Sequence, residues 1–401
     1  APMLDVAILG QVAFGYSPFI DRTRAVSATR LTVFPLKTDS SPDAAQLLHA
    51  VGGVWPADGA RVSLNVAGES LLQDLMQAQP APNVMVEIPA FMACDPANTA
   101  SIVSLHANGN SLLLKGRPLS ELPREVLPCF KYSIIDLADD RRADGSKPPP
   151  GVTRNIPHVQ AGVRSITEME HAFARGAEAV LGWPIDDAIQ AGNAKARAGQ
   201  PDMQTMVQLI RQVDAEEPIE KLENTLKRDP QLAFKLMRYI NSPAFGLRVE
   251  ISSFRHAIMM LGYKRLKRWV ALLLATASKD VNLKPVMFAA VRRGLLMEEL
   301  GRESSDEEMR SEMFICGVFS LLDRMFQQPF KELLANIPVP ERVFQALAEE
   351  TGPFQPYVNM VRAIENESLF DFRECADALM TSVSEINRAQ LRALMAASQL
   401  E

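Results

Sequence analysis

The chain has 401 residues, of which 47% are hydrophobic and 22% are charged, and its formal net charge is −6. At ~100–200 residues per domain this length predicts two or three domains, and the acidic balance argues against broad electrostatic binding of nucleic acid. The longest nearly apolar run, 269–277, which Thr276 interrupts, is shorter than the ~20 residues of a membrane-spanning helix. Because the start lacks a signal-peptide pattern and the four cysteines form no C-x-x-C pair, we expect a soluble, cytoplasmic protein without a zinc site or disulfide framework.

The first half of the chain alternates short β-rich runs with helical stretches, which is typical of an α/β fold with a parallel sheet. We expect strands at 62–66, 84–88 and 179–181, and helices at 43–51, 70–77 and 168–175. A polar break at 139–142 leads into three prolines and a glycine at 148–151. These residues cannot continue a helix or an inner strand, so we expect a loop over 139–151.

A change of pattern near residue 195 marks the expected domain boundary. Residues 186–201 lack apolar periodicity, and strand patterns are absent beyond them. We therefore predict one domain at 1–195 and another at 196–401. Apolar residues recur at helical spacing from 203 onward, which predicts an all-α second domain. The expected helix starts are Asp229 with Pro230, Ser253 and Ser384, and the expected helix ends are Gly262 and Gly301.

The sequence contains none of the common catalytic or phosphate-binding motifs. We find no G-x-x-x-x-G-K-[ST], no G-x-G-x-x-G between a strand and a helix, no H-E-x-x-H and no G-x-S-x-G. The five histidines are scattered and do not have the spacing of metal ligands. We therefore predict no catalytic residue and no cofactor.

One segment of the second half resembles a known domain family. The stretch 228–243, which ends in Asn241-Ser242-Pro243, together with 251–253 and 257–262, resembles the HDOD domain over 204–278. HDOD domains are similar to HD metal-dependent phosphohydrolases, of the modified HD-GYP kind, that have lost the His-Asp metal ligands. Ser320 and Leu321 stand where that pair would be. Since a hydroxyl and an isobutyl group cannot hold two metal ions, the resemblance implies no phosphohydrolase activity.

The first half, in turn, resembles a degenerate EAL domain, the (β/α) barrel that hydrolyses cyclic di-GMP in bacterial signalling. The resemblance is carried in chain order by 18–21, 64–66, 86–88, 135–136, 162–163 and 181–183. It implies a TIM-barrel-like domain shortened from the typical ~250 residues, with helices missing. The fold class expected for the chain is therefore α/β plus all-α.

Departures from the EAL pattern imply that the metal site of the family is absent. Arg30 replaces the Glu of the name-giving motif, Lys115 replaces part of an Asp-Asp pair, and Ala161 replaces a late Glu. Phe34 stands where binding-competent relatives have a phosphate-contacting Arg. Two basic side chains and fewer carboxylates disfavour two divalent cations in one pocket. We therefore expect no metal and no phosphodiesterase activity.

Five residues define a relic EAL pocket by this alignment: Arg30, Asn65, Glu87, Lys115 and Asp136. Of these, Asn65, Glu87 and Asp136 keep the residue types that the resemblance implies. One interpretation is a structural cluster in which the two cations pair with Glu87 or Asp136. A second is an anion or phosphate site lined by the two cations. A third is that the divergent first strands are misaligned.

A local basic patch places Lys264, Arg265, Lys267 and Arg268 at the start of an otherwise apolar helix. The simpler interpretation is a solvated helix face whose aliphatic stems cover the core. The alternative is a docking site for an acidic partner or for nucleic acid.

The leading hypothesis is a catalytically inactive bacterial signal-transduction protein, a pseudoenzyme that acts as a protein-interaction or regulatory module. The alternative is a sensor that binds cyclic di-GMP in the relic pocket without cleaving it. We expect unidentified protein partners and no membrane insertion, regard nucleic acid as disfavoured, and leave homo-oligomerisation open.

Overall fold

The computed structural model describes residues 7–39, 41–139, 156–189, 201–247, 249–302 and 306–400. The chain divides into two compact units. The barrel unit comprises 1–187, 363–376 and 381–388, and the helical unit comprises 188–362, 377–380 and 389–401. Most of the expected loop at 139–151 and of the expected boundary segment at 186–201 lies outside the described residues.

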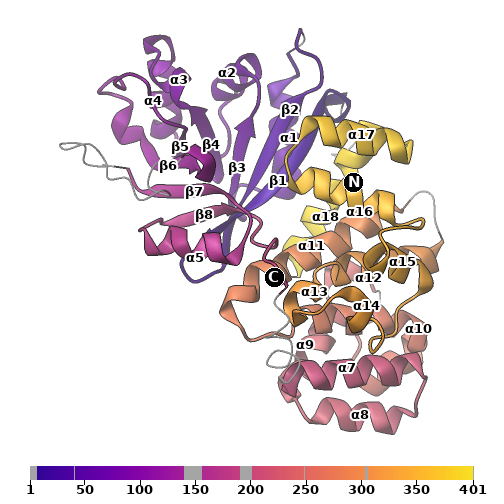
Figure 1. Ribbon diagram of the computed structural model, residues 1–401. Helices are drawn as coiled ribbons and strands as arrows, with labels where there is room; N and C mark the ends of the chain where they lie inside the picture. Colours follow the sequence, from indigo (N-terminus) through magenta and orange to yellow (C-terminus); the bar gives the residue numbers. More distant parts are fainter. Residues whose placement is uncertain are drawn as a thin grey trace. The chain divides into compact units, whose positions relative to one another are not determined.

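Eight strands form a closed barrel in chain order (Figure 1). They are β1 Val12–Asp21, β2 Val26–Pro35, β3 Val62–Val66, β4 Val84–Pro89, β5 Leu112–Lys115, β6 Phe130–Asp136, β7 His158–Val163 and β8 Ala179–Gly182. Strand β1 is antiparallel to both β2 and β8, and the remaining neighbours are parallel. A short turn joins β1 to β2, which an antiparallel pair permits and a parallel pair does not. The predicted TIM-barrel-like fold is confirmed.

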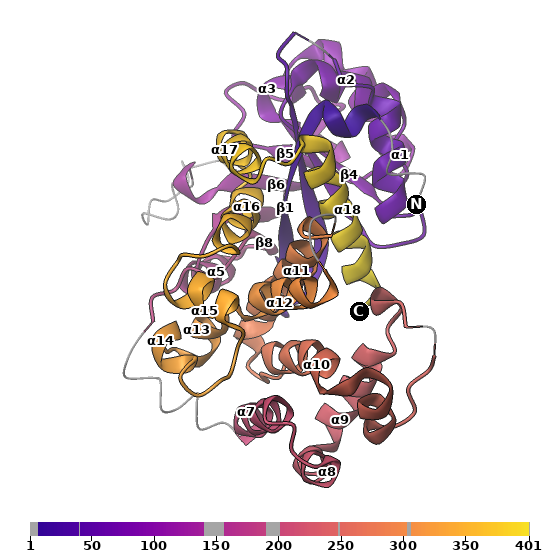
Figure 2. The same cartoon turned by 90° about the vertical axis from the view of Figure 1, so that its right-hand side faces the viewer.

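Helices connect most of the parallel strands and lie outside the barrel (Figures 1 and 2). They are α1 Ala44–Val54, α2 Glu69–Gln77, α3 Ala90–Ala93, α4 Thr99–Ala107 and α5 Ile166–Ala174. The connection 116–129 between β5 and β6 is fully described and contains no α-helix, only the 3₁₀ turn η4 Leu127–Cys129. This short connection accounts for part of the domain's small size.

Inward-facing residues fill the barrel in layers, because successive side chains of a strand point to opposite faces. The layer toward the amino ends of the parallel strands is apolar and consists of Phe19, Ala28, Met85, Leu113, Ile134, Val159, Ala161 and Leu181. Farther toward the carboxyl ends, the same faces of the strands carry polar side chains. We call the apolar layer the floor of the barrel and the polar layer at the carboxyl ends of the parallel strands its mouth.

Residues 363–376 and 381–388, near the C-terminal end of the chain, belong to the barrel unit. Asn387 donates hydrogen bonds to the carbonyl oxygens of Leu9 and Val12, at 2.7 and 2.8 Å, and accepts one from the Phe14 amide. A Cβ at Gly15 would lie 2.9 Å from the Ile364 carbonyl oxygen. The close backbone approach and the satisfied polar groups explain why this distant segment packs on β1.

From residue 201 onward the described chain is helical, as predicted. The helices are α7 Pro201–Asp214, α8 Ile219–Lys227, α9 Pro230–Ile240, α10 Phe254–Ala275, α11 Lys284–Leu300, α12 Glu307–Phe319, α13 Leu322–Phe326, α14 Phe330–Leu333, α15 Glu341–Ala348, α16 Gln355–Glu365, α17 Leu369–Leu379 and α18 Val383–Gln399. The division between the two units falls within α16, α17 and α18. No helix in the described part of the chain has the length and apolar character needed to cross a membrane.

The structure confirms two of the predicted helix caps and places the third at a different residue. Asp229 caps α9 with Pro230 at its first position, and the Ser253 hydroxyl caps α10. Gly262 takes a φ of +73° within α10 and separates two helical segments there. At α18 the Ser382 hydroxyl, rather than that of Ser384, accepts the hydrogen bond from the Glu385 amide, so the predicted cap lies two residues too late.

Candidate functional site

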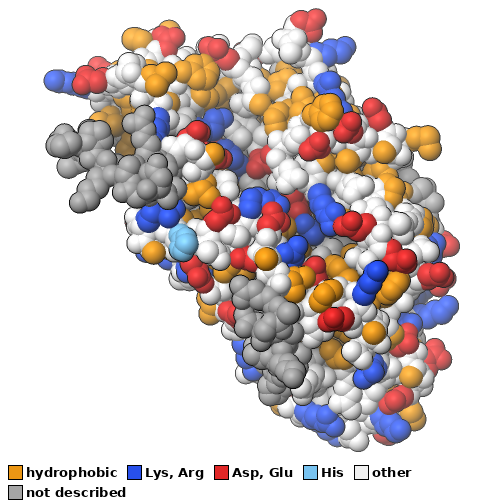
Figure 3. Space-filling model, in the orientation of Figure 1, with side chains coloured by type: hydrophobic (Ala, Val, Ile, Leu, Met, Phe, Trp, Pro, Cys, Tyr) orange, Lys and Arg blue, Asp and Glu red, His pale blue; other side chains and the backbone are white. Residues whose placement is uncertain are grey.

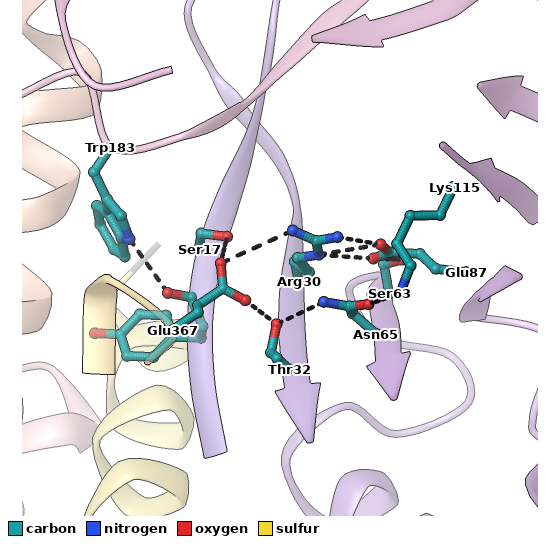
Figure 4. A network of polar contacts seen from close by, with 10 residues as sticks. Ser17, Arg30, Thr32, Ser63, Asn65, Glu87, Lys115, Trp183 and Glu367 are labelled. Atoms are coloured by element: carbon teal, nitrogen blue, oxygen red, sulfur yellow. Dashed lines mark hydrogen bonds and ion pairs between the residues drawn. The ribbon is translucent and has the colours of Figure 1, made fainter. Parts of the chain in front are cut away.

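Polar side chains from neighbouring strands meet at the mouth of the barrel, at the carboxyl ends of its parallel strands (Figure 4). This is the end at which barrel enzymes place their active sites. The residues are Ser17 on β1, Arg30 and Thr32 on β2, Ser63 and Asn65 on β3, Glu87 on β4 and Lys115 on β5. Four of the five residues of the predicted relic pocket are among them.

Arg30 and Glu87 form the central ion pair of the mouth. The Arg30 Nη2 lies 2.6 Å from Glu87 Oε1, and its Nε lies 3.1 Å from both carboxylate oxygens. The Ser63 hydroxyl donates to the other carboxylate oxygen at 2.8 Å. The side chain of Glu87 is 0% exposed and that of Arg30 is 13% exposed. Burial alone would lower the pKa of Arg30, but the nearby carboxylates, Glu87 first, raise it above its ordinary value.

A second line of hydrogen bonds runs from Lys115 to Thr32. The Lys115 ammonium group donates to Asn65 Oδ1 at 2.5 Å, and Asn65 Nδ2 donates to Thr32 Oγ1 at 3.1 Å. Burial lowers the pKa of Lys115, and the field of Glu87 acts in the opposite direction. Lys115 is thus engaged with an amide oxygen.

Glu367 brings a fourth charged group to the mouth from the C-terminal segment. Its carboxylate accepts hydrogen bonds from the hydroxyls of Ser17, at 2.8 Å, and Thr32, and lies 4.0 Å from Arg30 Nη1. Burial raises the pKa of Glu367, while Arg30 acts to lower it. Sequence analysis missed this residue because 335 and 350 positions separate it from its partners and no motif surrounds it.

Asp136 and Ala161 hold more peripheral places. The Asp136 carboxylate is exposed at the end of β6, where it accepts a hydrogen bond from the Ala138 amide at 3.0 Å. It adds to the field that raises the pKa of Arg30. Ala161 belongs to the apolar floor. Near the mouth, the indole of Trp183 packs edge-on against Tyr16 and donates to its carbonyl oxygen at 3.3 Å.

The donor set of the mouth does not fit a divalent cation. Both oxygens of Glu87 accept hydrogen bonds from Arg30, so a metal ion bound there would lie beside a guanidinium group. Over the described residues, no group of three or more His, Cys, Asp or Glu side chains is placed to hold a metal ion.

The positions predicted to correspond to an HD metal pair lie between α12 and α13. Ser320 is buried, donates to the Gly317 carbonyl oxygen at 2.7 Å and accepts from Arg293 Nη1 at 3.2 Å. Leu321 is also buried. These side chains make structural contacts within the helical unit.

The basic patch on α10 lies among acidic side chains. Its four ion pairs are Lys264 with Glu308 at 3.9 Å, Arg265 with Glu307 at 3.3 Å, Lys267 with Asp214 at 3.1 Å and Arg268 with Glu298 at 2.6 Å. Figure 3 likewise shows basic and acidic side chains interspersed over the visible face. This arrangement favours the interpretation as a solvated helix face over a docking site for an anionic polymer.

Comparison with known proteins identifies the helical region. Residues 200–330 match the family model of the HDOD domain. The uncharacterized protein YuxH of Bacillus subtilis (strain 168) is 28% identical over 168 residues, and the cyclic di-GMP phosphodiesterase CdgJ of Vibrio cholerae is 27% identical over 172 residues. These alignments cover 40% and 43% of this chain and 40% of each relative. The chain therefore spans about two fifths of the length of these curated relatives.

Two solved EAL structures are also similar. The cyclic di-GMP-bound form of a standalone EAL protein from Vibrio cholerae O395 has 16% identity and a TM-score of 0.31, over 44% of this chain and 91% of that chain. The calcium and cyclic di-GMP complex of Klebsiella pneumoniae BlrP1 has 15% identity and a TM-score of 0.31, over 44% of this chain and 55% of that chain. The chain thus matches the HDOD domain at 200–330, and an eight-stranded barrel precedes this region in the sequence.

Proposed function

We propose that this chain is a cytoplasmic, catalytically inactive regulatory protein of bacterial cyclic di-GMP signalling, and that its HDOD domain and barrel bind protein partners. The HDOD match and the relative named as a cyclic di-GMP phosphodiesterase support a place in this signalling system. The mouth of the barrel supports the absence of catalysis.

The ion pair of Arg30 and Glu87 is the observation that carries this proposal. Arg30 replaces an acidic residue of the EAL pattern and binds both oxygens of the carboxylate that the pattern retains. Two-metal hydrolysis needs carboxylates that are free to hold cations and to position a water molecule. A guanidinium group supplies the compensating charge here, but it neither activates water nor exchanges ligands.

Hydrolysis of cyclic di-GMP in the presence of Mg²⁺ or Mn²⁺, followed by chromatography of the products, tests this proposal. We expect no linear dinucleotide from the wild-type protein at either metal. The matched control is Glu87→Gln, which removes the one retained carboxylate of the central pair. Metal-dependent product formation that Glu87→Gln abolishes would overturn the proposal, because it would place a working metal ligand at Glu87.

The alternative function is binding of cyclic di-GMP without cleavage. Lys115 favours it, because this cation donates to an amide oxygen and not to a carboxylate. Calorimetric titration with cyclic di-GMP, with and without Mg²⁺, separates the two functions. Magnesium-independent binding that is lost in Lys115→Met and in the Arg30→Ala, Lys115→Ala double variant would establish a sensor. Absence of heat both in the wild-type protein and in Glu367→Gly, which removes the carboxylate that accepts from Ser17 and Thr32, would leave the interaction module as the function.

A further inference from the structure

The backbone at Glu367 has an unfavourable conformation for a residue with a side chain. Its φ is +52°, in the left-handed region that glycine prefers, which costs a non-glycine residue ~1 kcal/mol. Its side chain is 17% exposed, although an ionised carboxylate is costly to remove from water. Contacts at the mouth of the barrel must offset both costs.

These contacts form a seat of three donors on adjacent strands, which we call the β1–β2 seat: the hydroxyls of Ser17 and Thr32 and the guanidinium of Arg30. Both hydroxyl residues are 2% exposed, so the seat is built into the barrel. Hydroxyls combined with a guanidinium are a donor set suited to the oxygens of carboxylates and phosphates.

The direction of the hydrogen bonds also selects for an anion. Lys115 donates to Asn65, and Asn65 donates to Thr32. Because the Thr32 hydroxyl already accepts this bond, its own hydrogen is free to point to Glu367. Ser17 donates to the same carboxylate from the other strand, as Figure 4 shows. The relay therefore begins at a cation and ends at the oxygen of an anion.

We propose that the β1–β2 seat is an oxyanion-binding site that the chain keeps occupied with its own Glu367 carboxylate. Residues 363–376, which carry Glu367, then act as an internal plug of the barrel mouth. When Glu367 is withdrawn, the seat accepts an external oxyanion of the phosphate class. This inference does not depend on the proposed function, since an occupied seat would limit access to the mouth in a regulator and in a sensor alike.

Glu367→Gly is the most direct test. It removes the carboxylate and suits the positive φ. The matched control is Glu350→Gly, because Glu350 is exposed in the helical unit and has a φ of +53°. The probes are inorganic phosphate, dimethyl phosphate as a phosphodiester, and chloride at equal ionic strength, each titrated by calorimetry and by thermal unfolding.

We expect Glu367→Gly to bind inorganic phosphate at least ~10-fold more tightly than the wild-type protein and Glu350→Gly do, because one charge-assisted hydrogen-bonding site has become free. The added substitution Ser17→Ala should abolish this gain. If dimethyl phosphate binds more tightly than inorganic phosphate, the seat is suited to a phosphodiester. Tighter binding of either phosphate to Glu367→Gly supports an oxyanion site.

Two results would overturn the inference. One is a folded Glu367→Gly variant whose response to both phosphates equals that of Glu350→Gly. The other is wild-type protein that binds phosphate as tightly as Glu367→Gly, because Glu367 would then not occupy the seat. If Glu367→Gly fails to fold, Glu367→Gln keeps the side-chain volume and removes the charge. Glu367→Gln should also bind phosphate more tightly than the wild-type protein, but by a smaller factor than Glu367→Gly. Absence of any gain in phosphate affinity would count against the seat.

Discussion

Removing Arg30 should destabilise the barrel more than removing an ordinary surface cation. Arg30→Met keeps much of the side-chain length but leaves Glu87, which is 0% exposed, with the Ser63 hydroxyl as its remaining hydrogen-bond donor among the contacts described above. Breaking a buried ion pair from one side typically costs ~3–5 kcal/mol, because the other charge stays buried without compensation. We therefore expect the free energy of unfolding of the barrel unit to fall by ~4 kcal/mol.

Urea unfolding followed by tryptophan fluorescence measures this loss. Trp55 and Trp183 belong to the barrel unit and Trp269 to the helical unit, so a Trp269→Phe background makes the emission report on the barrel. The control is the double variant Arg30→Met, Glu87→Met, in which the Glu87 carboxylate is no longer left buried without its partner, while Glu367 keeps the hydroxyls of Ser17 and Thr32. Replacing a whole buried pair by apolar side chains is often nearly neutral, so the double variant should recover most of the loss.

Either of two outcomes would refute the reasoning. A loss below ~1 kcal/mol in Arg30→Met would match an exposed surface pair and not a buried one. A double variant as unstable as the single variant would show that the loss comes from packing of the arginine stem, since removal of the stranded carboxylate would have given no relief.

Three further predictions concern other parts of the chain. Asn387→Ala, which removes the hydrogen bonds to the carbonyls of Leu9 and Val12 and from the Phe14 amide, should lower barrel stability by ~3 kcal/mol in the same urea assay. An effect below ~1 kcal/mol would contradict this structural role. Burial lowers the pKa of Lys235 from 10.5 to about 8, so between these pH values the unfolded state binds more protons than the folded state. The free energy of unfolding should therefore rise with pH over this range in the wild type but not in Lys235→Met. In Gly317→Ala, the added Cβ would lie 2.4 Å from the Arg293 carbonyl oxygen. The thermal unfolding temperature of this variant should therefore fall, by the equivalent of ~1–3 kcal/mol. An unchanged temperature would show that α11 and α12 can separate freely.

Local patterns in the sequence predict most of the fold. The alternation of β-rich and helical runs predicts the strands β3 and β4 and the helices α1 and α2 within a few residues. The Asp229 cap and the break at Gly262 were also predictable, because a capping side chain and a positive φ are properties of single residues. The resemblance to EAL and HDOD sequences ordered these local elements into a barrel and a helical domain.

The candidate site could be predicted only in part. Pairing of Arg30 with Glu87 was one of the predicted interpretations, and the structure shows it across β3, which lies between the strands β2 and β4 that carry the two residues. Lys115, however, binds Asn65 and neither Glu87 nor Asp136. Its partner depends on the direction of the lysine side chain and on the nearby Asn65 amide, which the sequence does not reveal. The place of Glu367 could not be predicted, since it depends on how residues 363–388 return to β1 over more than 300 positions.

The charges of the mouth are best understood as one compensated set. Arg30 and Lys115 bring two positive charges to a part of the barrel where Glu87 and Glu367 bring two negative ones, while Asp136 remains exposed. Because Arg30 lies between both carboxylates, its loss strands two acids, and the loss of Glu367 leaves an unneutralised cation. The two substitutions should therefore be non-additive: Glu367→Gly in an Arg30→Met background should cost less stability than in the wild type, since the removed carboxylate is then itself uncompensated. Strict additivity would mean that Glu367 is held by the hydroxyls of Ser17 and Thr32 alone.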